Sequence, residues 1–396
     1  MSKKVLIISQ NFYPEIGSAG NRMKNIYKLL VDEGFEVNVL TTNPTYPNRN
    51  IYSDSDYWDD EELNQDISIH RVKVLNRKYS RSLINRLFYY IEITLRMIFS
   101  ILFNRNKYDI VLTTIPPIFI GIVGLIAKYK YKAKLILDVR DLWPDSLNGV
   151  GVFNNPIIMK CFLVIEKFLY KQSNKIIVNS KGFINPIQNK LKGMEKSITY
   201  IPNGARKVEL HNLVKLNKSF KVIYAGNIGL AQDEEVLKNL ACELYKNGII
   251  FTIIGYGLRH HSLKEFVRDH NLDNVQFLDT MTRTECLKVI SEHNVAIVSL
   301  KDEPVFETVL PGKIIDYMTC GVPVVGNVSG ISKETIENFQ VGIVVENNNE
   351  LINPILKMSS DPSLEQKYSK NAIDYVKKEF LWDENINLLK NQITSK

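Results

Sequence analysis

Short apolar runs alternate along the chain with longer stretches in which apolar residues recur every three or four positions. Residues 5–8 form the first such run, and polar residues from Ser9 onward end it, which predicts a buried parallel strand. A glycine-containing loop, a helical pattern over 21–33 and the helix-stopping Gly34 precede the second run, 37–40. Later runs are 110–113, 135–138 and 176–179. This alternation of strand and helix predicts a doubly wound parallel sheet.

The same pattern restarts in the second half of the chain. Its apolar runs are 220–224, 249–254, 275–277, 295–299, 322–325 and 342–345. The boundary falls close to Pro202-Asn203-Gly204, so the sequence predicts one Rossmann-like domain over 1–203 and a second over 204–378, followed by a helical tail. In such folds the carboxyl ends of both sheets border one cleft, where ligands bind. Two unrelated domains on a flexible linker are the alternative, but residues 199–206 are too short and too ordinary for one.

Length and cysteine content narrow the class of protein. The 396 residues are enough for two or three domains, and no solenoid repeat is found. No signal peptide is predicted, because Lys3 and Lys4 precede only a short apolar run. The cysteines form no C-x-x-C pair, so we expect buried or partly buried free thiols in a reducing cytoplasm, at Cys161, Cys242, Cys286 and Cys320.

The distribution of charge says more than the net charge of +7. Residues 71–134 hold thirteen Lys or Arg against only Glu92 and Asp109, a local charge of +11, and the rest of the chain is mildly acidic. A basic face on an acidic body predicts an anionic surface as partner.

The segment 311–325 combines features of an anion-binding site. Pro311 and Gly312 open a predicted helix whose free backbone N–H groups can receive an anion. Lys313 opposes the helix dipole there, which indicates a bound phosphate, and Asp316 lies one turn further on the same face. A surface lysine and a solvated aspartate are the alternative for this segment taken alone.

A second segment, 135–145, runs from a buried strand into three carboxylates, an arginine and a tryptophan. We expect Asp141 to orient an acceptor hydroxyl or to stabilise positive charge on a sugar, and Arg140 to pair with a phosphate or with Asp138. A structural Arg–Asp pair at the end of the strand is the alternative.

The sequence predicts no metal site. Asp54-Ser-Asp56 is a D-x-D sequence, but it lies in an acidic loop from Tyr52 to Glu62, which we interpret as solvated. The six histidines show no spacing typical of metal ligands.

Residues 82–103 combine a broad apolar pattern with Arg81, Arg86 and Arg96 nearby or within it. These charges and Glu92 make a membrane-spanning helix costly. An amphipathic helix on an anionic leaflet is the functional interpretation, and a core helix of the first domain is the alternative. Both hold if one face packs while the other meets lipid.

The segment 311–325 resembles the donor-site helix of glycosyltransferase family 4, retaining enzymes of GT-B fold in which P-S-K-x-x-E-Y-M-A-x-G-x-P-V is common. Other family motifs follow in order: a glycine loop at 13–17, the interdomain P-N-G at 202–204, and loops at 226–232 and 254–257. The resemblance is closest to the branch that builds capsule and O-antigen units, including N-acetylfucosamine transferases. It implies two Rossmann-like domains facing a central cleft, with a helix over 379–396 returning to the first.

The resemblance also implies roles for single residues. Asp316 stands at the second acidic position of the family's E-x7-E motif, which accepts hydrogen bonds from the donor ribose, although Asp is one methylene shorter than the usual Glu. The first acidic position falls on Thr308, beside Glu307. The family's Arg and Lys after the first strand of the second domain fall on Asn227 and Gln232.

The donor diphosphate must then be neutralised differently, by Lys313, Arg259 and the amino termini of helices. Arg140 and Asp141 occupy the place where many relatives carry a catalytic-site His. The catalytic candidates are Asp141, Arg140, Glu307 and Asp316. The donor-binding candidates are Gly17, Gly20, Gly226, Asn227, Gly229, Gln232, Gly255, Gly257, Arg259, Thr308, Leu310, Pro311, Gly312, Lys313 and Asp316.

These features together predict a retaining glycosyltransferase that requires neither cofactor nor metal. It would move a sugar, N-acetylfucosamine or another N-acetylhexosamine, from a UDP-sugar to a polyprenyl-diphosphate-linked sugar in capsule or O-antigen synthesis. The expected partners are donor, acceptor and an anionic membrane surface, without nucleic acid. The expected location is cytoplasmic, peripheral on the inner face of the cell membrane.

Two alternatives stay open. A nucleotide-sugar epimerase shares the architecture, but a soluble sugar nucleotide needs no basic membrane-facing segment. A catalytically inactive nucleotide-sugar-binding partner is suggested by Thr308, Asn227 and Gln232. A dehydrogenase is disfavoured, because no G-x-G-x-x-G follows the first strand of either domain.

Overall fold

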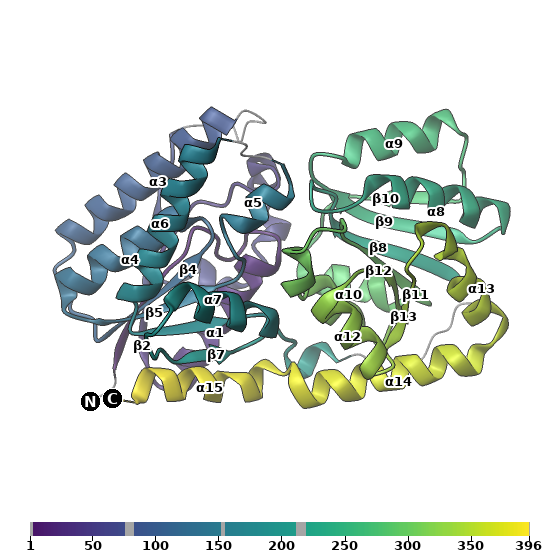
Figure 1. Cartoon of the computed structure of the whole chain (residues 1–396). Coiled ribbons are helices and arrows are strands. Elements are labelled where there is room, and N and C mark those ends of the chain that lie inside the picture. Colours follow the sequence, from purple (N-terminus) through teal and green to yellow (C-terminus); the bar gives the residue numbers. More distant parts are fainter. Residues whose placement is uncertain (1–2, 76–82, 152–154, 211–218, 396) are drawn as a thin grey trace. The chain divides into compact units, whose positions relative to one another are not determined.

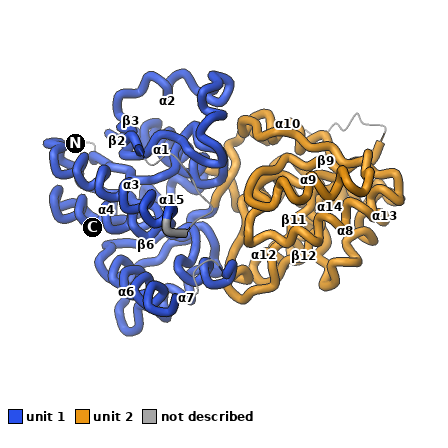
Figure 2. The backbone as a smooth tube through the Cα atoms, turned by 90° about the horizontal axis from the view of Figure 1, so that it is seen from above, with its two compact units in different colours: residues 1–202, 383–396 blue, residues 203–382 orange. Residues whose placement is uncertain are grey.

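The computed structural model describes residues 3–75, 83–151, 155–210 and 219–395. The chain forms two compact units, which Figure 2 shows in different colours. The first unit comprises 1–202 and 383–396, and the second comprises 203–382. The chain therefore passes from one unit to the other twice.

The first unit is built on a seven-stranded sheet in the order β3-β2-β1-β4-β5-β6-β7, in which every neighbouring pair is parallel. The strands are β1 (Lys4–Ile8), β2 (Glu36–Thr42), β3 (Ile69–Val72), β4 (Ile110–Ile115), β5 (Lys134–Val139), β6 (Lys175–Val178) and β7 (Ile198–Tyr200). The central strands are apolar and buried on both faces, as a sheet covered by helices on both sides requires. The predicted doubly wound parallel sheet is confirmed.

Helices cover both faces of this sheet (Figure 1). They are α1 (Ser18–Asp32), α2 (Glu61–Gln65), α3 (Leu83–Phe103), α4 (Ile118–Tyr131), α5 (Asp145–Gly149), α6 (Pro156–Gln172), α7 (Ile184–Leu191) and α15 (Trp382–Thr394). The crossovers through α3, α4 and α6 all step toward the β7 edge, whereas the one through α1 steps toward β3. Since parallel crossovers are right-handed, α3, α4 and α6 lie on one face and α1 on the other.

The second unit has a six-stranded parallel sheet in the order β10-β9-β8-β11-β12-β13. Its strands are β8 (Lys221–Asn227), β9 (Ile250–Tyr256), β10 (Val275–Leu278), β11 (Val295–Ser299), β12 (Val324–Asn327) and β13 (Gly342–Val344). Its helices are α8 (Glu234–Lys246), α9 (His260–Asp269), α10 (Arg283–Ser291), α11 (Gly312–Thr319), α12 (Gly330–Asn338), α13 (Ile352–Ser360) and α14 (Pro362–Glu379). One apolar cluster packs α10, α11, α12 and α14 against the sheet, and a second packs α8, α9 and α13.

Short 3-10 helices complete both units. They are η1 (Arg49–Ser53), η2 (Ser55–Tyr57), η3 (Lys181–Phe183), η4 (Lys207–Glu209), η5 (Phe306–Thr308) and η6 (Asn348–Glu350).

Each sheet has a point at which the strand order changes direction. In the first unit it lies between β1 and β4, and in the second between β8 and β11. Connections leave in opposite directions there, and ligands of such folds bind at this point, outside the carboxyl ends of the strands. The candidate residues of both units gather at these two edges.

The carboxyl-terminal helical segment is not continuous, because it breaks between α14, which ends at Glu379, and α15, which begins at Trp382. Gly204 lies against this break: a Cβ there would be 2.3 Å from the Phe380 carbonyl oxygen. Ala205 donates its N–H to that oxygen (2.8 Å), and Trp382 donates to the Ala205 carbonyl (2.9 Å). These bonds tie residues 380–382 to the second unit, so the chain leaves it after Trp382 rather than after residue 378.

Beyond the break, α15 packs into the first unit. Its Ile386, Leu389 and Ile393 are buried. Lys3 donates through Nζ to the Ile393 carbonyl at 2.8 Å, and Lys175 donates to the Gln392 carbonyl at the same distance. Residues from the last helix thereby complete the unit that the first strand begins.

Candidate functional site

In the second unit, α11 stands over the change of strand order between β8 and β11. The hydroxyl of the buried Tyr317 accepts from the Ala225 N–H at 2.9 Å and lies 3.2 Å from the carbonyl oxygens of Ala225 and Ile297. One side chain thus fixes the helix to both central strands. Pro311 precedes the first helical residue, Gly312, and provides no side-chain cap. The Ile314 N–H donates to the Pro311 carbonyl at 3.0 Å, so the N–H groups of Gly312 and Lys313 are the candidate donors to an anion at this end of the helix.

Lys313, on the first turn of α11, is a partly buried cation. Its Nζ donates to the Tyr224 hydroxyl at 2.7 Å and lies 4.0 Å from the centre of that ring. Burial lowers the pKa of the Lys313 ammonium group to about 7. Among the described residues it makes no salt bridge with an acid. A Cβ on Gly226 (φ 125°) would lie 3.6 Å from its Nζ, so the ammonium group faces open backbone.

The two glycine loops after β8 and β9 pack directly against each other. The Asn227 side chain occupies the space between them, so a Cβ on Gly257 would lie 2.2 Å from Asn227 Oδ1 and a Cβ on Gly229 would lie 2.6 Å from its Nδ2. The Asn227 Oδ1 atom is buried and accepts no hydrogen bond within the part of the chain that the structure describes. Glycine is required at both positions, and the close fit brings the backbones of both loops to the carboxyl edge beside Lys313.

Backbone hydrogen bonds hold this pair of loops. Ile228 donates its N–H to the Tyr256 carbonyl at 2.7 Å, and the Arg259 N–H donates to the Ile228 carbonyl at 3.0 Å. Gln232 accepts the Gly229 N–H through Oε1 at 2.9 Å. A Cβ on Gly255 would lie 2.9 Å from Ile228 Cδ1, so this glycine too is set by packing. Gln232 therefore shapes the loop in the place where relatives carry a cation.

Arg259 is less available than Lys313. It precedes α9, and its Nη1 lies 3.4 Å from Glu234 Oε2. Glu234 also pairs with Lys238 at 3.1 Å. The predicted contact of Arg259 with a diphosphate stays a prediction, and it would compete with this ion pair.

Asp316 belongs to a three-residue charge network. Arg283 donates to Asp316 Oδ1 from Nη1 at 2.8 Å and to Glu209 from Nε at 2.6 Å and from Nη2 at 3.2 Å. Burial raises the pKa of Asp316, and Arg283 opposes that shift. Burial disfavours the charged form of Arg283, but Asp316 and Glu209 raise its pKa overall. The arginine thus holds one oxygen of Asp316, and Oδ2 has no bond among the described residues.

Sequence reasoning missed Arg283 and Glu209. A local signal for Arg283 existed, because Thr282 and Glu285 form a capping box that starts α10 directly after β10. That position is at the carboxyl edge of the sheet, where ligands bind. No sequence pattern near Glu209 indicates a functional residue, because its partner Arg283 is 74 residues away along the chain.

Residues of α12 hold the backbone of the segment that precedes α11. A Cβ on Gly330 would lie 2.1 Å from the Glu307 carbonyl oxygen, and Ser332 donates its hydroxyl to the Val309 carbonyl at 2.7 Å. Thr308 donates to the Val305 carbonyl at 2.6 Å, and Leu310 is buried. The Glu307 side chain is exposed. The backbone here is fixed, whereas the catalytic role suggested for the Glu307 carboxylate stays a prediction.

In the first unit, the carboxyl end of β5 holds a buried ion pair that involves Asp138, one of the two partners expected for Arg140. Arg22 of α1, not Arg140, pairs with Asp138, at 2.8 Å from Nη2 and 3.2 Å from Nε to Oδ1. Both side chains are fully buried. Arg22 also donates to the Pro202 carbonyl at 3.1 Å. It therefore ties α1, β5 and the end of the first unit together.

Arg140 and Asp141 have other partners. Arg140 donates to Thr114 Oγ1 at 2.6 Å and to the Pro116 carbonyl at 3.0 Å, and burial lowers its pKa. Asp141 accepts from the Ser146 hydroxyl at 2.7 Å, and burial raises its pKa. Arg140 and Asp141 make no direct salt bridge, although each charge influences the pKa of the other. Their roles toward an acceptor stay predictions.

The amino-terminal glycine loop leads into α1. Gly17 precedes the helix with φ 122° and offers no side-chain cap, and a Cβ on Gly20 would lie 2.3 Å from the Glu15 carbonyl oxygen. Glu15 is buried and accepts the Tyr46 N–H at 2.9 Å. Burial raises the pKa of Glu15 to about 8. The loop is thus compact, with the first turn of α1 at the carboxyl edge of the sheet.

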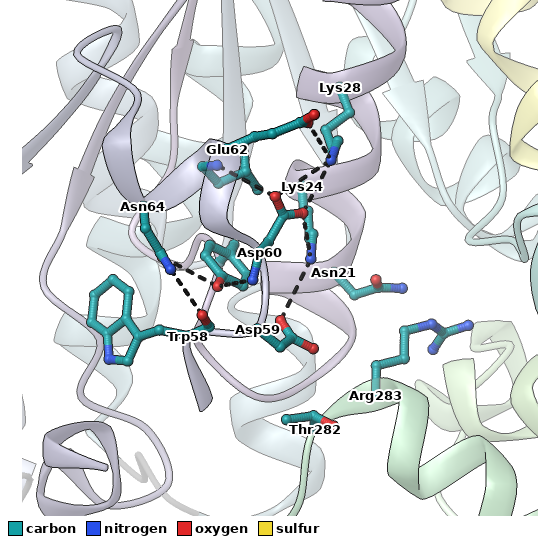
Figure 3. A network of polar contacts seen from close by, with 12 residues as sticks. Asn21, Lys24, Lys28, Trp58, Asp59, Asp60, Glu62, Asn64, Thr282 and Arg283 are labelled. Carbon is teal, nitrogen blue, oxygen red and sulfur yellow. Dashed lines mark hydrogen bonds and ion pairs between the residues drawn. The ribbon is translucent and has the colours of Figure 1, made fainter. Parts of the chain in front are cut away.

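The acidic loop is held by lysines of α1, as Figure 3 shows. Asp60 lies between Lys24 (3.0 Å) and Lys28 (3.1 Å), and Lys28 also pairs with Glu62 at 3.2 Å. The earlier part of the loop, Asp54-Ser-Asp56, is exposed. Within the described ranges, no three His, Cys, Asp or Glu side chains converge as metal ligands would.

The helix expected over 82–103 is observed as α3, and it has two different faces. The face toward the sheet is buried, through Tyr89, Ile93, Met97 and Ile101. The opposite face is apolar and exposed, through Phe88, Ile91, Leu95, Phe99 and Leu102. A core role and an exposed apolar face therefore coexist, and contact with lipid stays a prediction.

The three arginines proposed for membrane contact differ. Arg81 lies outside the described residues, Arg86 is partly exposed, and Arg96 pairs with Glu92 at 2.8 Å. Across the described part of the chain, no helix is both long and apolar enough to cross a bilayer.

Both halves of the chain match families of known proteins. Residues 17–204 match the family described as Glycosyl transferase 4-like domain, and residues 205–375 match the family described as Glycosyl transferases group 1. The putative colanic acid biosynthesis glycosyl transferase WcaI of Escherichia coli (strain K12) is 22% identical over 335 residues, which are 80% of this chain and 81% of that protein.

Solved structures share the fold over the full length. Sucrose-phosphate synthase from Thermosynechococcus elongatus superposes with a TM-score of 0.75 at 18% identity and covers 98% of both chains. The Anabaena protein HepE, solved in complex with UDP-glucose, superposes with a TM-score of 0.73 at 15% identity and covers 100% of both chains.

Proposed function

The chain is a glycosyltransferase of GT-B fold, with a glycosyl transferase 4-like domain before a glycosyl transferases group 1 domain, and we propose that it transfers a sugar from a UDP-sugar to a lipid-linked acceptor. The observation that carries the donor part of this proposal is Lys313. A partly buried ammonium group without an acidic partner among the described residues lies beside Gly226 of the first glycine loop, on the first turn of α11. A diphosphate is the group that this combination of charge and N–H donors fits.

UDP as the nucleotide is supported by HepE, whose structure contains UDP-glucose. We propose that Asp316 accepts a hydrogen bond from the donor ribose through the oxygen that Arg283 leaves unbound. The sugar is an N-acetylhexosamine such as N-acetylfucosamine in this proposal, which rests on the family resemblance of segment 311–325.

The proposed reaction retains the configuration at the anomeric carbon and uses no metal. The bond from that carbon to the diphosphate oxygen breaks, the acceptor hydroxyl forms the new bond on the same face, and its proton leaves with the departing UDP. Lys313 and the N–H groups at Gly312 stabilise the negative charge that develops on the diphosphate. Asp141 and Arg140 orient the acceptor in this proposal.

The acceptor proposed is a polyprenyl-diphosphate-linked sugar in capsule or O-antigen synthesis. The relative named for colanic acid biosynthesis supports a role in a surface polysaccharide. The exposed apolar face of α3 beside basic segments supports an acceptor held at an anionic membrane, with the enzyme peripheral on its cytoplasmic face.

The test combines a panel of UDP-sugars with lipid-linked acceptors, with and without EDTA. We expect transfer from one UDP-N-acetylhexosamine, unchanged by the chelator, with the new linkage in the same anomeric configuration as the donor. Activity lost in EDTA and restored by Mg²⁺ or Mn²⁺ would refute the metal-free mechanism. Conversion of the donor without any acceptor would indicate an epimerase, and tight UDP-sugar binding without transfer would indicate an inactive binding partner.

A further inference from the structure

The helix α6 carries a second exposed apolar stripe that its sequence did not single out. Ile157, Val164 and Phe168 recur at helical spacing and are 73%, 62% and 49% exposed. The exposed Cys161 lies on the same stripe, which corrects the expectation that all four thiols are at least partly buried. The opposite side of the helix is buried, through Phe162, Glu166, Leu169 and Tyr170. A soluble protein rarely exposes contiguous apolar surface of this kind without a partner.

The stripe of α6 continues the exposed face of α3. Both helices pack against α4, which lies between them on the same face of the sheet (Figure 1). On α4 the residues at the same helical spacing, Phe119, Ile122 and Ile126, are partly exposed. Lys130 of α4 donates to the carbonyls of Ile101 (2.5 Å) and Asn104 (2.8 Å), which fixes α4 to the carboxyl end of α3. We name the exposed surface of α3, α4 and α6 the three-helix face.

The charges on the three-helix face are almost all positive. Lys160, Lys167 and Lys171 are exposed on α6. The one acid of α6, Glu166, is buried and pairs with Lys190 at 2.7 Å. On α3 the one acid, Glu92, is already paired with Arg96. An apolar surface bordered by unopposed cations is complementary to an anionic lipid leaflet, since lysine stems lie along apolar surface while their ammonium groups reach the headgroups.

Aromatic side chains join the three-helix face to the loop that holds Arg140 and Asp141. The ring of Trp143, which directly follows that loop, lies 4.9 Å from Phe162 of α6. Phe119 of α4 lies 5.8 Å from Phe162 and is stacked 6.0 Å from Tyr90 of α3. These aromatic contacts therefore pack α3, α4 and α6 together next to the loop that holds Arg140 and Asp141. We call that loop the acceptor loop.

We propose that α6 is a second membrane-binding helix, and that the three-helix face as a whole lies on an anionic leaflet. This inference rests on the proposed function only in taking the acceptor to be membrane-held. The contact presents the acceptor loop at the bilayer surface, within reach of a diphosphate-linked sugar anchored by its lipid.

The test uses the full-length protein with vesicles of phosphatidylcholine alone or with phosphatidylglycerol. Two double variants remove different features of α6: Val164→Glu with Phe168→Glu, and Lys160→Glu with Lys167→Glu. The matched control is Val31→Glu, which places a charge on an exposed valine of α1 on the opposite face. We expect each double variant to bind anionic vesicles at least about tenfold more weakly. In the lysine variant each lost cation near the leaflet contributes roughly fivefold, and in the other variant two apolar side chains are replaced by negative charges. The control should bind like the wild type.

A third variant separates this inference from the proposed function. Leu95→Glu with Phe99→Glu on α3 should weaken vesicle binding as the α6 variants do, while transfer to a water-soluble acceptor stays unchanged in all of them. Wild-type vesicle binding by both α6 variants would overturn the role of α6, even if the α3 variant loses binding. A wild-type protein that ignores anionic vesicles but self-associates through Val164 and Phe168 would overturn the membrane assignment and make the face an interface between two copies.

Discussion

At the scale of single residues, Lys313 and Asp316 show how burial and neighbours set the chemistry of the candidate donor site. Lys313 is held by an aromatic ring and a hydroxyl rather than by an acid, so its charge is available. Asp316 is held by an arginine, so its position is fixed while one oxygen stays available. The two side chains lie on one helix, three residues apart, and in the proposed donor complex they would contact different parts of the UDP-sugar.

The pKa of Lys313 predicts how donor binding depends on pH. A bound diphosphate favours the charged amine, whereas burial lowers the pKa of the unliganded protein to about 7. Above pH 7 binding must therefore take up a proton, and we expect the affinity for an intact UDP-sugar to fall by up to about tenfold per pH unit. Calorimetry from pH 6 to 9 measures this. Lys313→Arg should bind without the decline, and Lys313→Ala should bind weakly at every pH. A flat wild-type profile would contradict the assignment.

Arg283 is predicted to act on the donor through Asp316. We expect Asp316→Ala to abolish transfer and leave the fold intact.

Arg283→Gln should raise KM for the UDP-sugar about tenfold or more with little change in kcat, because loss of a charge-assisted hydrogen bond amounts to about 1.5–3 kcal/mol. Arg283→Lys should restore part of the loss. Arg268→Gln is the matched control, since Arg268 is an exposed arginine that pairs with its neighbour Asp269. Equal loss of kcat and stability in Arg283→Gln would instead indicate a structural role.

Local pattern was sufficient for some of these residues and not for others. Lys313 and Asp316 could be predicted because they stand at fixed offsets within one helix start. Arg22 and Arg283 could not, since their acidic partners are 116 and 33 or 74 residues away. A buried arginine has the same sequence signature as an exposed one. Only the topology that brings α1 to β5, and α10 to α11, shows that Arg22 is buried and that Arg283 meets two acids.

At the scale of elements, the candidate site depends on how closely the glycine loops after β8 and β9 approach each other. Gly257 has φ 113° and sits against Asn227 and the Ile228 carbonyl. Any side chain there would separate the two loops. The geometry of the proposed diphosphate site thus requires a residue without a Cβ atom at position 257.

We predict that Gly257→Ala weakens donor binding more than any cost in backbone strain explains. Both Gly257 and Gly248 have positive φ, but a Cβ on Gly248 meets nothing within 4 Å. Each alanine should lose roughly 1–2 kcal/mol of stability from its backbone conformation. Only Gly257→Ala should also lose UDP-sugar affinity, because its Cβ displaces Asn227. Thermal unfolding and calorimetric titration of both variants test this, and intact affinity in Gly257→Ala would place the donor elsewhere.

Strands were predictable from apolar runs, because a parallel strand covered on both faces has few polar positions. Helix ends were harder to predict than strands, since α1 begins at Ser18 although the periodic pattern starts at residue 21. The break between α14 and α15 leaves no mark in the hydrophobic pattern. It arises from hydrogen bonds to Ala205, a partner more than 170 residues earlier. The tie of the acidic loop to α1 through Lys24 and Lys28 is equally nonlocal.

At the scale of the whole molecule, two similar sheets are joined by two covalent crossings. The sequence pattern places the first crossing after residue 203, where one strand pattern ends and another begins, and the compact units divide after residue 202. The second crossing falls four residues later than predicted. The reason is that residues 380–382 pair with the start of the second unit.

The last helix offers a direct test of this organisation. Leu389 is fully buried in the first unit, whereas its neighbour Leu388 is 41% exposed. We expect Leu389→Ala to destabilise the first unit by about 2–5 kcal/mol and Leu388→Ala to change stability by less than about 0.5 kcal/mol. Differential scanning calorimetry should show one transition lowered in Leu389→Ala and the other unmoved. If both transitions shift equally, the two units unfold as one.

The return of α15 to the first unit also has a consequence for biosynthesis. Domains that form during translation usually do so from the amino terminus onward. Here the residues that cover the first sheet at α15 are made after every residue of the second unit. The second sheet can therefore reach its native state while the earlier one is still missing a helix. The amino-terminal unit is begun first on the ribosome and finished last.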